Sequence, residues 1–411
     1  MASLTARASD RLERAFGAAR ARTRTPGRRT RTTVVLGRVL GVMLIVCFAT
    51  GLYSHVLQNP LDWLPLLPRP VHLYRVTQGL HVITGLALIP VLLGKLWSVY
   101  PRLFAWPPVS GPVTLLERGS IALLVGAAVL EVALGVMNIA QWYPFPFSFR
   151  AVHFVLAWVL VGAMILHIGI KLPLIQAYWR RRPDGSSEDE PTEPRTWPDA
   201  PDPDTERQPT VAEGVSRRGA LIAVGSAAGV VALATAGQTV APLAPLAVLA
   251  PRRPGIGPQG LPVNRTAAEA GVIASARSPE WRLTVVGPDG SADLSLMDLR
   301  SMPQHTVELP IACVEGWSQN AVWTGVRVQD VIALVGAGPD SDVRFTSLQT
   351  RGAFATSRMR HEYVSDPLSL IALRLGGETL DIEHGYPARV IAPGRPGVRQ
   401  TKWLSAVEVT T

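Results

Sequence analysis

Five apolar segments of about the length that crosses a bilayer constrain this chain more than any other feature of its sequence. A run of about 20 apolar residues can span the hydrocarbon core as a helix. The hydrophobic share of 47% agrees with a large membrane portion. We predict a bundle of four membrane helices within residues 34–178 and a fifth, anchoring helix at 216–240. The segments cover residues 34–54, 79–97, 119–140, 151–172 and about 219–240.

Basic residues gather before the first apolar segment, between the second and the third, and after the fourth. Because positive charge favours the cytoplasmic side, their pattern predicts a cytoplasmic N-terminus and an external position for the two loops that hold few basic residues. The formal net charge of +9 follows from this anchoring, and no recognition motif indicates a nucleic-acid partner. The basic positions are the arginine-rich residues 1–33, then Lys95, Arg102 and Arg118, then Lys171 and the arginines at 180–182.

The composition changes after the fourth segment. Residues 179–215 are rich in proline and acidic residues, which predicts a disordered cytoplasmic linker. Residues 250–411 carry short β-type runs separated by Gly, Pro and Asp turns: WRLTVVG, HTVELPIACV, DVRFTSLQT and ARVIAP. We expect residues 250–411 to form a mainly β, or α+β, globular domain outside the membrane.

The chain has two cysteines, so no disulfide framework is proposed. Cys47 lies in an apolar segment and is most simply a small buried side chain. Cys313 ends an apolar run in the stretch ELPIACVEGWSQNAVWTG. On composition alone a buried structural cysteine is the ordinary interpretation of Cys313, because cysteine is among the most buried residue types.

Three separated segments, however, resemble the sulfite oxidase family of molybdenum enzymes, which includes the bacterial periplasmic methionine sulfoxide reductase. They are the cysteine stretch, LPVNRTAA at 261–268, and HGYPARVIAPGRPGVRQTKWLSAVEV at 384–409. The segments follow the order expected for the family, and the resemblance covers roughly residues 260–411, a short version of the family's domain. It implies a sulfite-oxidase-type fold, the cofactor molybdopterin and oxygen-atom transfer at molybdenum.

The resemblance also implies roles for individual residues. The Cys313 thiolate is implied to be a direct molybdenum ligand and the catalytic residue, and a soft thiolate suits a redox metal. A pterin with a terminal phosphate needs clustered cationic donors, which the C-terminal basic residues supply. A solvated basic face, and a core position for His384, are the simpler alternatives. The residues implied to bind molybdopterin are Asn264, Arg265, Gly316, Trp317, His384, Arg389, Arg399 and Lys402.

Paired arginines precede the fifth apolar segment, in SRRGAL at 216–221. This pattern fits a twin-arginine signal, which directs folded proteins across the membrane. Molybdopterin enzymes acquire their cofactor in the cytoplasm, so such a passenger must be exported folded. We therefore expect the general export machinery to insert the first four segments and the twin-arginine machinery to handle the fifth, which stays as an anchor. The alternative is that Arg217 and Arg218 only supply positive charge to an ordinary helix.

Four histidines lie in or beside the predicted membrane helices, where histidine is expensive and usually functional. His81 and His153 are at similar predicted depth near the outer ends of two helices, and we favour this pair as axial ligands of one haem b. His55 is a rival partner. His167 follows His153 by 14 residues, nearly on the same helix face. This spacing resembles four-helix membrane cytochromes b, although no histidine opposes His167. Packing between helices is the simpler alternative for all four.

These features together predict a membrane oxidoreductase that exchanges electrons between the quinone pool, a b-type haem and an external molybdenum site. Its small-molecule substrate is an S- or N-oxide in preference to sulfite.

Glu131, inside the third segment, is either a protonated structural group or part of a quinone proton path. The competing hypothesis is a non-catalytic membrane assembly or sensor protein that kept the fold.

Overall fold

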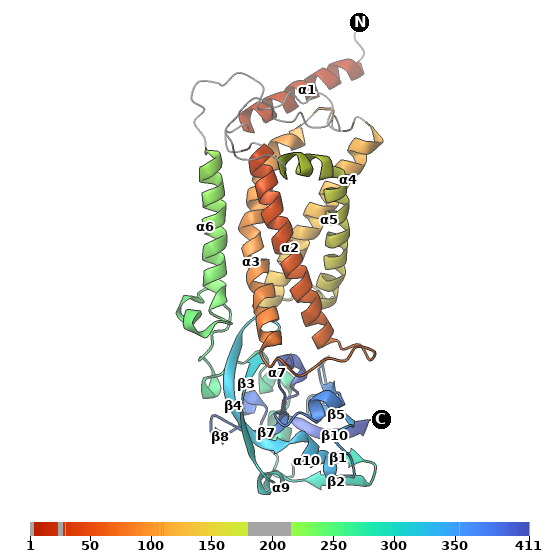
Figure 1. Ribbon diagram of the computed structural model, residues 1–411, viewed down its shortest axis with the longest axis vertical. Coiled ribbons are helices and arrows are strands. Elements are labelled where there is room, and N and C mark those ends of the chain that lie inside the picture. Colours follow the sequence, from red (N-terminus) through yellow and green to blue (C-terminus); the bar gives the residue numbers. More distant parts are fainter. Residues whose placement is uncertain are drawn as a thin grey trace. The chain divides into compact units, whose positions relative to one another are not determined.

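A computed structural model describes residues 4–23, 28, 30–104, 106–107, 109, 111–179, 215–352 and 354–410. Long helices come first along the chain and a sheet-rich part follows (Figure 1). The predicted linker at 179–215 falls almost entirely outside the described residues. The long helices are α1 Leu4–Thr23, α2 Thr30–Gln58, α3 Leu73–Val99, α4 Pro112–Ala140, α5 Phe149–Trp179 and α6 Arg217–Ala236.

The helices α2 to α6 confirm the five predicted apolar segments. Each is long and apolar enough, by length and composition, to cross a membrane. Each also exposes large apolar side chains, among them Val42, Leu93, Leu130, Ile165 and Val230. Such side chains are costly in water and favourable in lipid. The exposed faces therefore agree with a membrane environment.

Helix α6 ends at Ala236, four residues before the predicted limit at residue 240. The chain folds back at this point, because a Cβ on Gly237 would lie 2.0 Å from the carbonyl oxygen of Leu243. Only glycine permits so close a backbone approach. The N–H of Leu249 then donates to the carbonyl of Ala234, and a short 3-10 helix η3, Ala241–Leu246, makes the turn.

By their contacts the residues form two compact units. One comprises Met1–Val46 and Thr84–Ala232, and the other comprises Cys47–Ile83 and Leu233–Thr411. The second unit therefore contains the C-terminal end of α2 and the N-terminal end of α3 as well as the sheets. The domain boundaries expected from composition, including the one at residue 250, stay predictions.

Within the first unit, α4 packs along α5. Ala127 and Ala128 on α4 are buried in one apolar cluster with Leu160 on α5. Near the other end of these helices, Lys171 Nζ lies 2.5 Å from a carboxylate oxygen of Glu117, whose side chain is almost fully buried. Small residues permit the close helix approach, and the ion pair offsets the cost of burying a charge.

The second unit contains two five-stranded sheets. Their orders are β2-β1-β10-β5-β6 and β3-β4-β7-β8, with β9 also paired to β7, and among the strands that the structure describes only β1 and β10 run parallel. The strands are β1 Leu283–Gly287, β2 Gly290–Leu294, β3 His305–Ala312, β4 Ser318–Arg327, β5 Asp342–Ser347, β6 Thr356–Met359, β7 Leu370–Leu375, β8 Glu378–Thr379, β9 Arg389–Ile391 and β10 Leu404–Thr410. The short helices are η2 Tyr100–Phe104 in the first unit, and η4 Pro258–Gly260, α7 Ala267–Ala270, α8 Ile273–Arg277, α9 Leu296–Ser301, α10 Val328–Ala333, α11 His361–Val364, η5 Ile382–His384 and η6 Gly397–Arg399 in the second.

The strand sequences explain where the core lies. In β1 the buried Leu283 and Val285 alternate with more exposed neighbours, so one face of that sheet is apolar. Strand β7 has buried residues at 370–373 in succession, as expected for a central strand covered on both faces. One cluster joins the facing sides of the two sheets and includes Val285, Phe345 and Ile371. The predicted β runs at 281–287, 305–314, 342–350 and 388–393 all contain strands.

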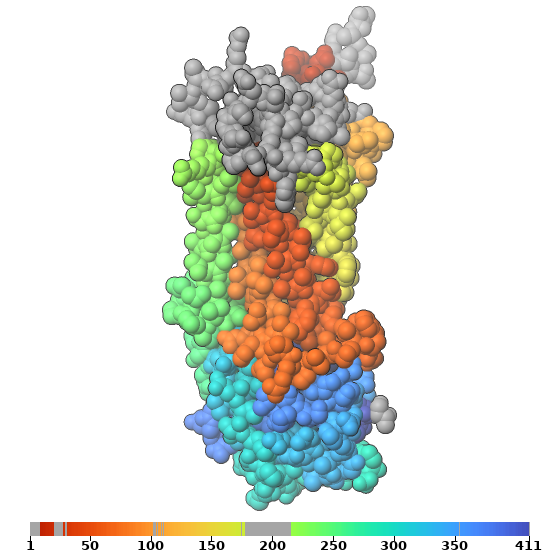
Figure 2. All heavy atoms as spheres, viewed as in Figure 1, coloured from red at the N-terminus to blue at the C-terminus, as the bar shows by residue number. Residues whose placement is uncertain are grey.

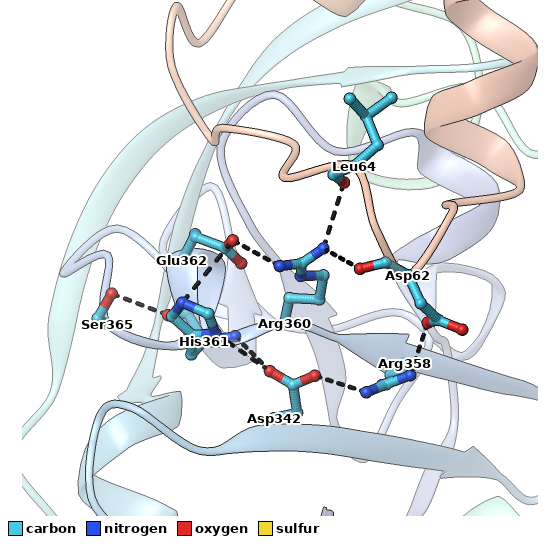
Figure 3. Close-up of polar contacts among 8 residues, drawn as sticks. All are labelled: Asp62, Leu64, Asp342, Arg358, Arg360, His361, Glu362 and Ser365. Atoms are coloured by element: carbon cyan, nitrogen blue, oxygen red, sulfur yellow. Dashed lines mark hydrogen bonds and ion pairs between the residues drawn. The ribbon is translucent and has the colours of Figure 1, made fainter. Parts of the chain in front are cut away.

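The segment between α2 and α3, residues 59–72, lies against the sheet-rich part of the same unit. Figure 2 shows its orange atoms resting on the blue atoms of the C-terminal region. The Arg69 guanidinium donates to both carboxylate oxygens of Asp366, each at 3.2 Å. Arg358 and Arg360 reach the same segment at Asp62, as Figure 3 shows. These contacts hold the segment that joins α2 to α3 against the sheet-rich part.

Candidate functional site

Cys313 follows β3 directly and opens a tight turn toward β4. Its N–H donates to the carbonyl of Trp317 at 2.9 Å, and the N–H of Gly316 donates back to the carbonyl of Cys313 at 3.1 Å. Gly316 has φ +99°, in the left-handed region that favours glycine. The turn, hereafter the Cys313 loop (residues 313–317), directs the Cys313 side chain into an apolar cluster with Leu309, where it is 2% exposed.

The Cys313 thiol has a polar neighbour on one side. Asn264 Nδ2 lies 3.4 Å from Sγ and donates to it. The role of Asn264 in binding the pterin stays a prediction. Burial, and then the charge of Glu315, raises the pKa of the Cys313 thiol. The thiol is therefore protonated in this environment, and binding of a metal ion would have to displace its proton.

Glu315 is itself buried and paired. Its carboxylate accepts from Arg252 Nη1 at 2.7 Å, and Arg252 Nε donates to the carbonyl of Val263 at 2.8 Å. This ion pair links the Cys313 loop to the strand-like segment that carries Asn264. Because the two charges neutralise each other, the pair adds little net charge beside the thiol.

Lys402 lies on the other side of the site. Its Nζ donates to the carbonyl oxygens of Arg265 at 2.7 Å and Glu383 at 2.9 Å. Burial lowers the pKa of Lys402 to about 7, and a thiolate at Cys313 would be close enough to favour the ammonium form. The structure thus brings Cys313, Asn264, Arg265 and Lys402 together.

Arg389 and His384 extend this group. The Arg389 guanidinium is 2% exposed and donates to the carbonyls of His384 at 3.0 Å and Gln400 at 3.3 Å. His384 Nε2 donates to the carbonyl of Pro258 at 2.6 Å, and burial lowers the pKa of His384 to about 4. His384 is therefore a neutral, hydrogen-bonded side chain that braces the backbone beside Arg389.

Arg399 contacts the end of α2. Its Nε donates to the carbonyl of Gln58 at the end of α2, at 2.8 Å. Arg395, which sequence reasoning missed, is more deeply buried and donates to the carbonyls of Arg358 and Arg399. Burial lowers the pKa of Arg395 to about 9. Its position in the loop GRPGVRQ, between two glycines that allow close approach, was the available signal.

The predicted haem histidines show one local feature in common. His81 Nδ1 lies 2.9 Å from the carbonyl of Cys47, and His153 Nδ1 lies 3.3 Å from a carboxylate oxygen of Glu131. With the proton on Nδ1, the His81 ring keeps its lone pair on Nε2, which is how metal-ligating histidines are commonly held. The contact of His153 Nδ1 with Glu131 is within ion-pair distance but lacks the geometry of a hydrogen bond. His81 belongs to the second unit and His153 to the first, so their pairing on one haem stays a prediction.

The other two histidines are less informative. The carbonyl of His55 accepts from the N–H and the side-chain amide of Asn59 at the end of α2. His167 lies on α5 in the first unit. The roles of His55 and His167 as haem ligands stay predictions.

Comparison with known proteins decides the class of the sheet-rich part. Residues 270–411 match the family model described as "Oxidoreductase molybdopterin binding domain". Residues 270–411 form a molybdopterin-binding oxidoreductase domain. The resemblance seen in the sequence is thereby confirmed, as is the order of a helical region followed by a sheet-rich molybdopterin domain.

Three relatives illustrate the range of this similarity. Mouse mitochondrial sulfite oxidase is 32% identical over 157 residues, covering 31% of this chain and 29% of that protein. "Uncharacterized oxidoreductase YuiH" of Bacillus subtilis is 31% identical over 133 residues, covering 32% and 66%. "Putative protein-methionine-sulfoxide reductase subunit YedZ1" of Azospira oryzae is 29% identical over 116 residues, covering 28% and 43%. The chain spans about three tenths of the length of the mouse sulfite oxidase.

The geometry of the molybdopterin-binding domain fits an anionic pterin. Arg389, Arg395, Arg399 and Lys402 donate mainly to backbone carbonyls, and within the part of the chain that the structure describes neither they nor Arg265 forms an ion pair with a carboxylate. Buried cations without counter-ions are costly, and a phosphate would relieve that cost. Three buried N–H groups, on Trp317 Nε1, Arg265 Nε and Arg389 Nε, also have no hydrogen-bond partner among the described residues.

Proposed function

We propose that this protein is a membrane-bound molybdopterin oxidoreductase that reduces an S- or N-oxide with electrons from the quinone pool, passed through a b-type haem. The observation that carries the proposal is the meeting of the buried Cys313 thiol with a group of buried and half-buried cations that form no ion pair with a carboxylate among the described residues. This is the donor set that a molybdenum-bound, phosphorylated pterin requires.

In this proposal the residues of the site have separate tasks. Cys313 holds molybdenum through its thiolate, and Asn264 steadies that sulfur by the hydrogen bond to Sγ. Arg265, Arg389, Arg399 and Lys402, with the additional Arg395, hold the pterin and its phosphate. The bound cofactor supplies two-electron oxygen-atom transfer. Gly316 and Trp317 shape the Cys313 loop, and His384 supports Arg389 through the backbone.

We favour an S- or N-oxide over sulfite as the substrate because of the similarity to one relative. The name of the Azospira oryzae relative, a methionine-sulfoxide reductase subunit, supports the same substrate class.

For the haem, we propose His81 and His153 as axial ligands with Nε2 toward iron. Glu131 then orients the His153 ring through the 3.3 Å contact with Nδ1, which assigns this membrane carboxylate a positioning task. His55 is the rival partner of His153. The molybdopterin domain lies outside, delivered by the twin-arginine machinery, and the N-terminus lies in the cytoplasm.

Cys313→Ser tests the proposal. Serine can accept the Asn264 hydrogen bond, so we expect the thermal midpoint to fall by only a few degrees, in line with a cost of about 1 kcal/mol. Turnover of methionine sulfoxide should be nearly abolished, because an alkoxide is a harder metal donor than a thiolate.

Metal, pterin and haem analysis of the purified wild-type protein accompanies this test. Turnover at the wild-type rate in Cys313→Ser contradicts the proposal. Haem without molybdenum or pterin in the wild-type protein supports the non-catalytic alternative.

A further inference from the structure

The Cys313 loop rests directly on the N-terminal end of α3, within the second unit. Gln78 on α3 is buried, and its Nε2 donates to the carbonyl of Val314 at 2.6 Å. A Cβ on Gly316 would lie 2.8 Å from Cγ2 of Val82, so the loop backbone touches the helix surface. Gln78 and Val82 are four residues apart and share one face of α3.

The turn that follows α6 makes a second set of contacts with the Cys313 loop and the residue after it. Thr239, after α6, donates to the carbonyl of Gly316 at 2.7 Å, and the N–H of Ser318 donates to the carbonyl of Gln238 at 2.8 Å. Arg75 on α3 donates to the carbonyl of Thr239 at 2.6 Å. The Cys313 loop is therefore enclosed between α3 and the turn that follows α6.

Gln78 also belongs to a hydrogen-bonded chain that reaches the cationic side of the site. Its Oε1 accepts from the hydroxyl of Ser54 on α2, and Ser54 accepts from Gln58 Nε2 at 3.0 Å. The carbonyl of Gln58 in turn accepts from Arg399 at 2.8 Å. One polar network thus connects the ends of α2 and α3 with the Cys313 loop and a candidate cofactor arginine.

His81 lies on α3 between the two residues that touch the loop. It follows Gln78 by three residues and directly precedes Val82. A covalent step from His81 to Val82, a van der Waals contact from Val82 to Gly316 and the hydrogen bond from Gly316 to the Cys313 carbonyl complete a continuous route. Electron tunnelling weakens steeply with distance, and bonded or closely packed atoms carry it better than open space.

We propose that electrons travel between His81 and Cys313 across this contact, and that Gln78 is the residue that positions the Cys313 loop for it. The inference rests on the proposed function, in which His81 binds haem and Cys313 binds molybdenum. One methionine sulfoxide takes two electrons, in two single crossings, and two protons, and yields the thioether and water. A hydroquinone supplies both electrons and releases two protons as it becomes the quinone.

The ion pair and hydrogen bonds of segment 59–72 explain how this contact persists. Asp366 accepts from Arg69 just before α3 begins. Arg360 donates to the carbonyls of Asp62 and Leu64, as Figure 3 shows. The segment is tied at both ends to the sheet-rich part. The Cys313 loop and α3 therefore stay together without a mobile electron carrier.

The test compares Gln78→Leu and Val82→Ala with the wild-type protein and with Thr77→Val. Thr77 is the matched control, because its hydroxyl donates to carbonyls of its own helix at Leu73 and Tyr74. Purified full-length protein is reduced with a hydroquinone under anaerobic conditions and mixed with methionine sulfoxide in a stopped-flow spectrometer. The rate of haem reoxidation reports the crossing, and turnover driven by a reduced viologen dye reports the molybdenum site alone.

We expect haem reoxidation to slow several-fold in Gln78→Leu, because loss of the hydrogen bond to Val314 lets the Cys313 loop move away from α3 and lengthens the path for electrons. Val82→Ala should also slow it, while haem content, molybdenum content and dye-driven turnover stay at wild-type levels in both variants. Thr77→Val should behave as wild type. A merely structural Gln78 would change stability or dye-driven turnover and not the reoxidation rate alone.

Two results overturn the inference, and they differ. Unchanged haem reoxidation in both variants, with dye-driven turnover intact, refutes the route and leaves the proposed function standing. Wild-type protein that contains haem and molybdenum but reduces no oxide with the dye refutes the proposed function, and the route falls with it.

Discussion

Lys402→Met is the sharpest test of the buried cationic group. In the protein without cofactor, burial lowers the pKa of Lys402 from 10.5 to about 7. Below about pH 7 the folded and unfolded states both carry the proton, so folding bears the full cost of the buried charge. Between pH 7 and 10.5 the folded state releases a proton that the unfolded state keeps. The stability of the cofactor-free protein should therefore rise with pH across this window, and methionine should abolish that part of the rise.

The magnitude follows from the same pKa. One pKa unit corresponds to about 1.4 kcal/mol, so the interval from 10.5 to about 7 sets an upper limit of about 5 kcal/mol. The variant lacks the hydrogen bonds from Nζ to the carbonyls of Arg265 and Glu383 at every pH. Their loss therefore cancels when the stability difference between wild type and variant is compared at two pH values. A domain of this size shifts its thermal midpoint by roughly 2–4 °C per kcal/mol. Between pH 6.5 and pH 9.5 we expect the thermal midpoint of the wild-type protein to rise by several degrees relative to that of the variant.

Thermal unfolding in detergent, followed by tryptophan fluorescence, measures this difference in cofactor-free and cofactor-loaded protein. A bound phosphate would hold Lys402 in its charged form, so the loaded protein should show a much smaller pH-dependent difference from the variant. Equal midpoint differences at both pH values in the cofactor-free protein would refute the buried-cation argument. A loaded protein that keeps the whole pH-dependent gain would show that no anion binds beside Lys402.

Three further predictions address the other assignments. Replacing Arg217 and Arg218 together by lysine keeps the positive charge but removes the twin-arginine pattern, so residues 250–411 should stay in the cytoplasm; normal protease accessibility from outside would contradict this. His153→Ala should lose the low-spin b-type spectrum of the outer haem, and an unchanged spectrum removes His153 from the site. Gly316→Ala should destabilise the protein by about 2–4 kcal/mol, from the positive φ and the contact with Val82, and a thermal midpoint equal to wild type would refute that geometry.

The sequence alone determined the elements that depend on local composition. Runs of apolar residues predicted the five long helices because backbone in lipid must satisfy its own hydrogen bonds. Alternating or continuous apolar runs predicted β1, β3, β5 and β9 in the same way. Cys313, with the segments around Asn264 and Arg389, was recognisable because the residue types and their order resemble a family with known chemistry.

The end of α6 depended on a contact remote in sequence and was misplaced by four residues. Gly237 stops the helix because the chain returns against the carbonyl of Leu243, which no local propensity reveals. Arg395 was overlooked for a related reason. A buried arginine is distinguished from a surface one only by what covers it, here Tyr363 and the carbonyl of Arg358.

The contact between the Cys313 loop and α3 could not be predicted from the sequence and is set by the tertiary structure alone. Gln78 and Val82 are separated from Cys313 by more than two hundred residues, and in the sequence they are ordinary members of an apolar helix. The hydrogen bond of Gln78 to Val314 and the packing of Val82 on Gly316 arise only when the end of α2 and the start of α3 fold with the sheets. The type of a residue determines whether its side chain can be buried or can form a hydrogen bond. Which residue it contacts depends on the path of the whole chain, because side-chain contacts require proximity in space.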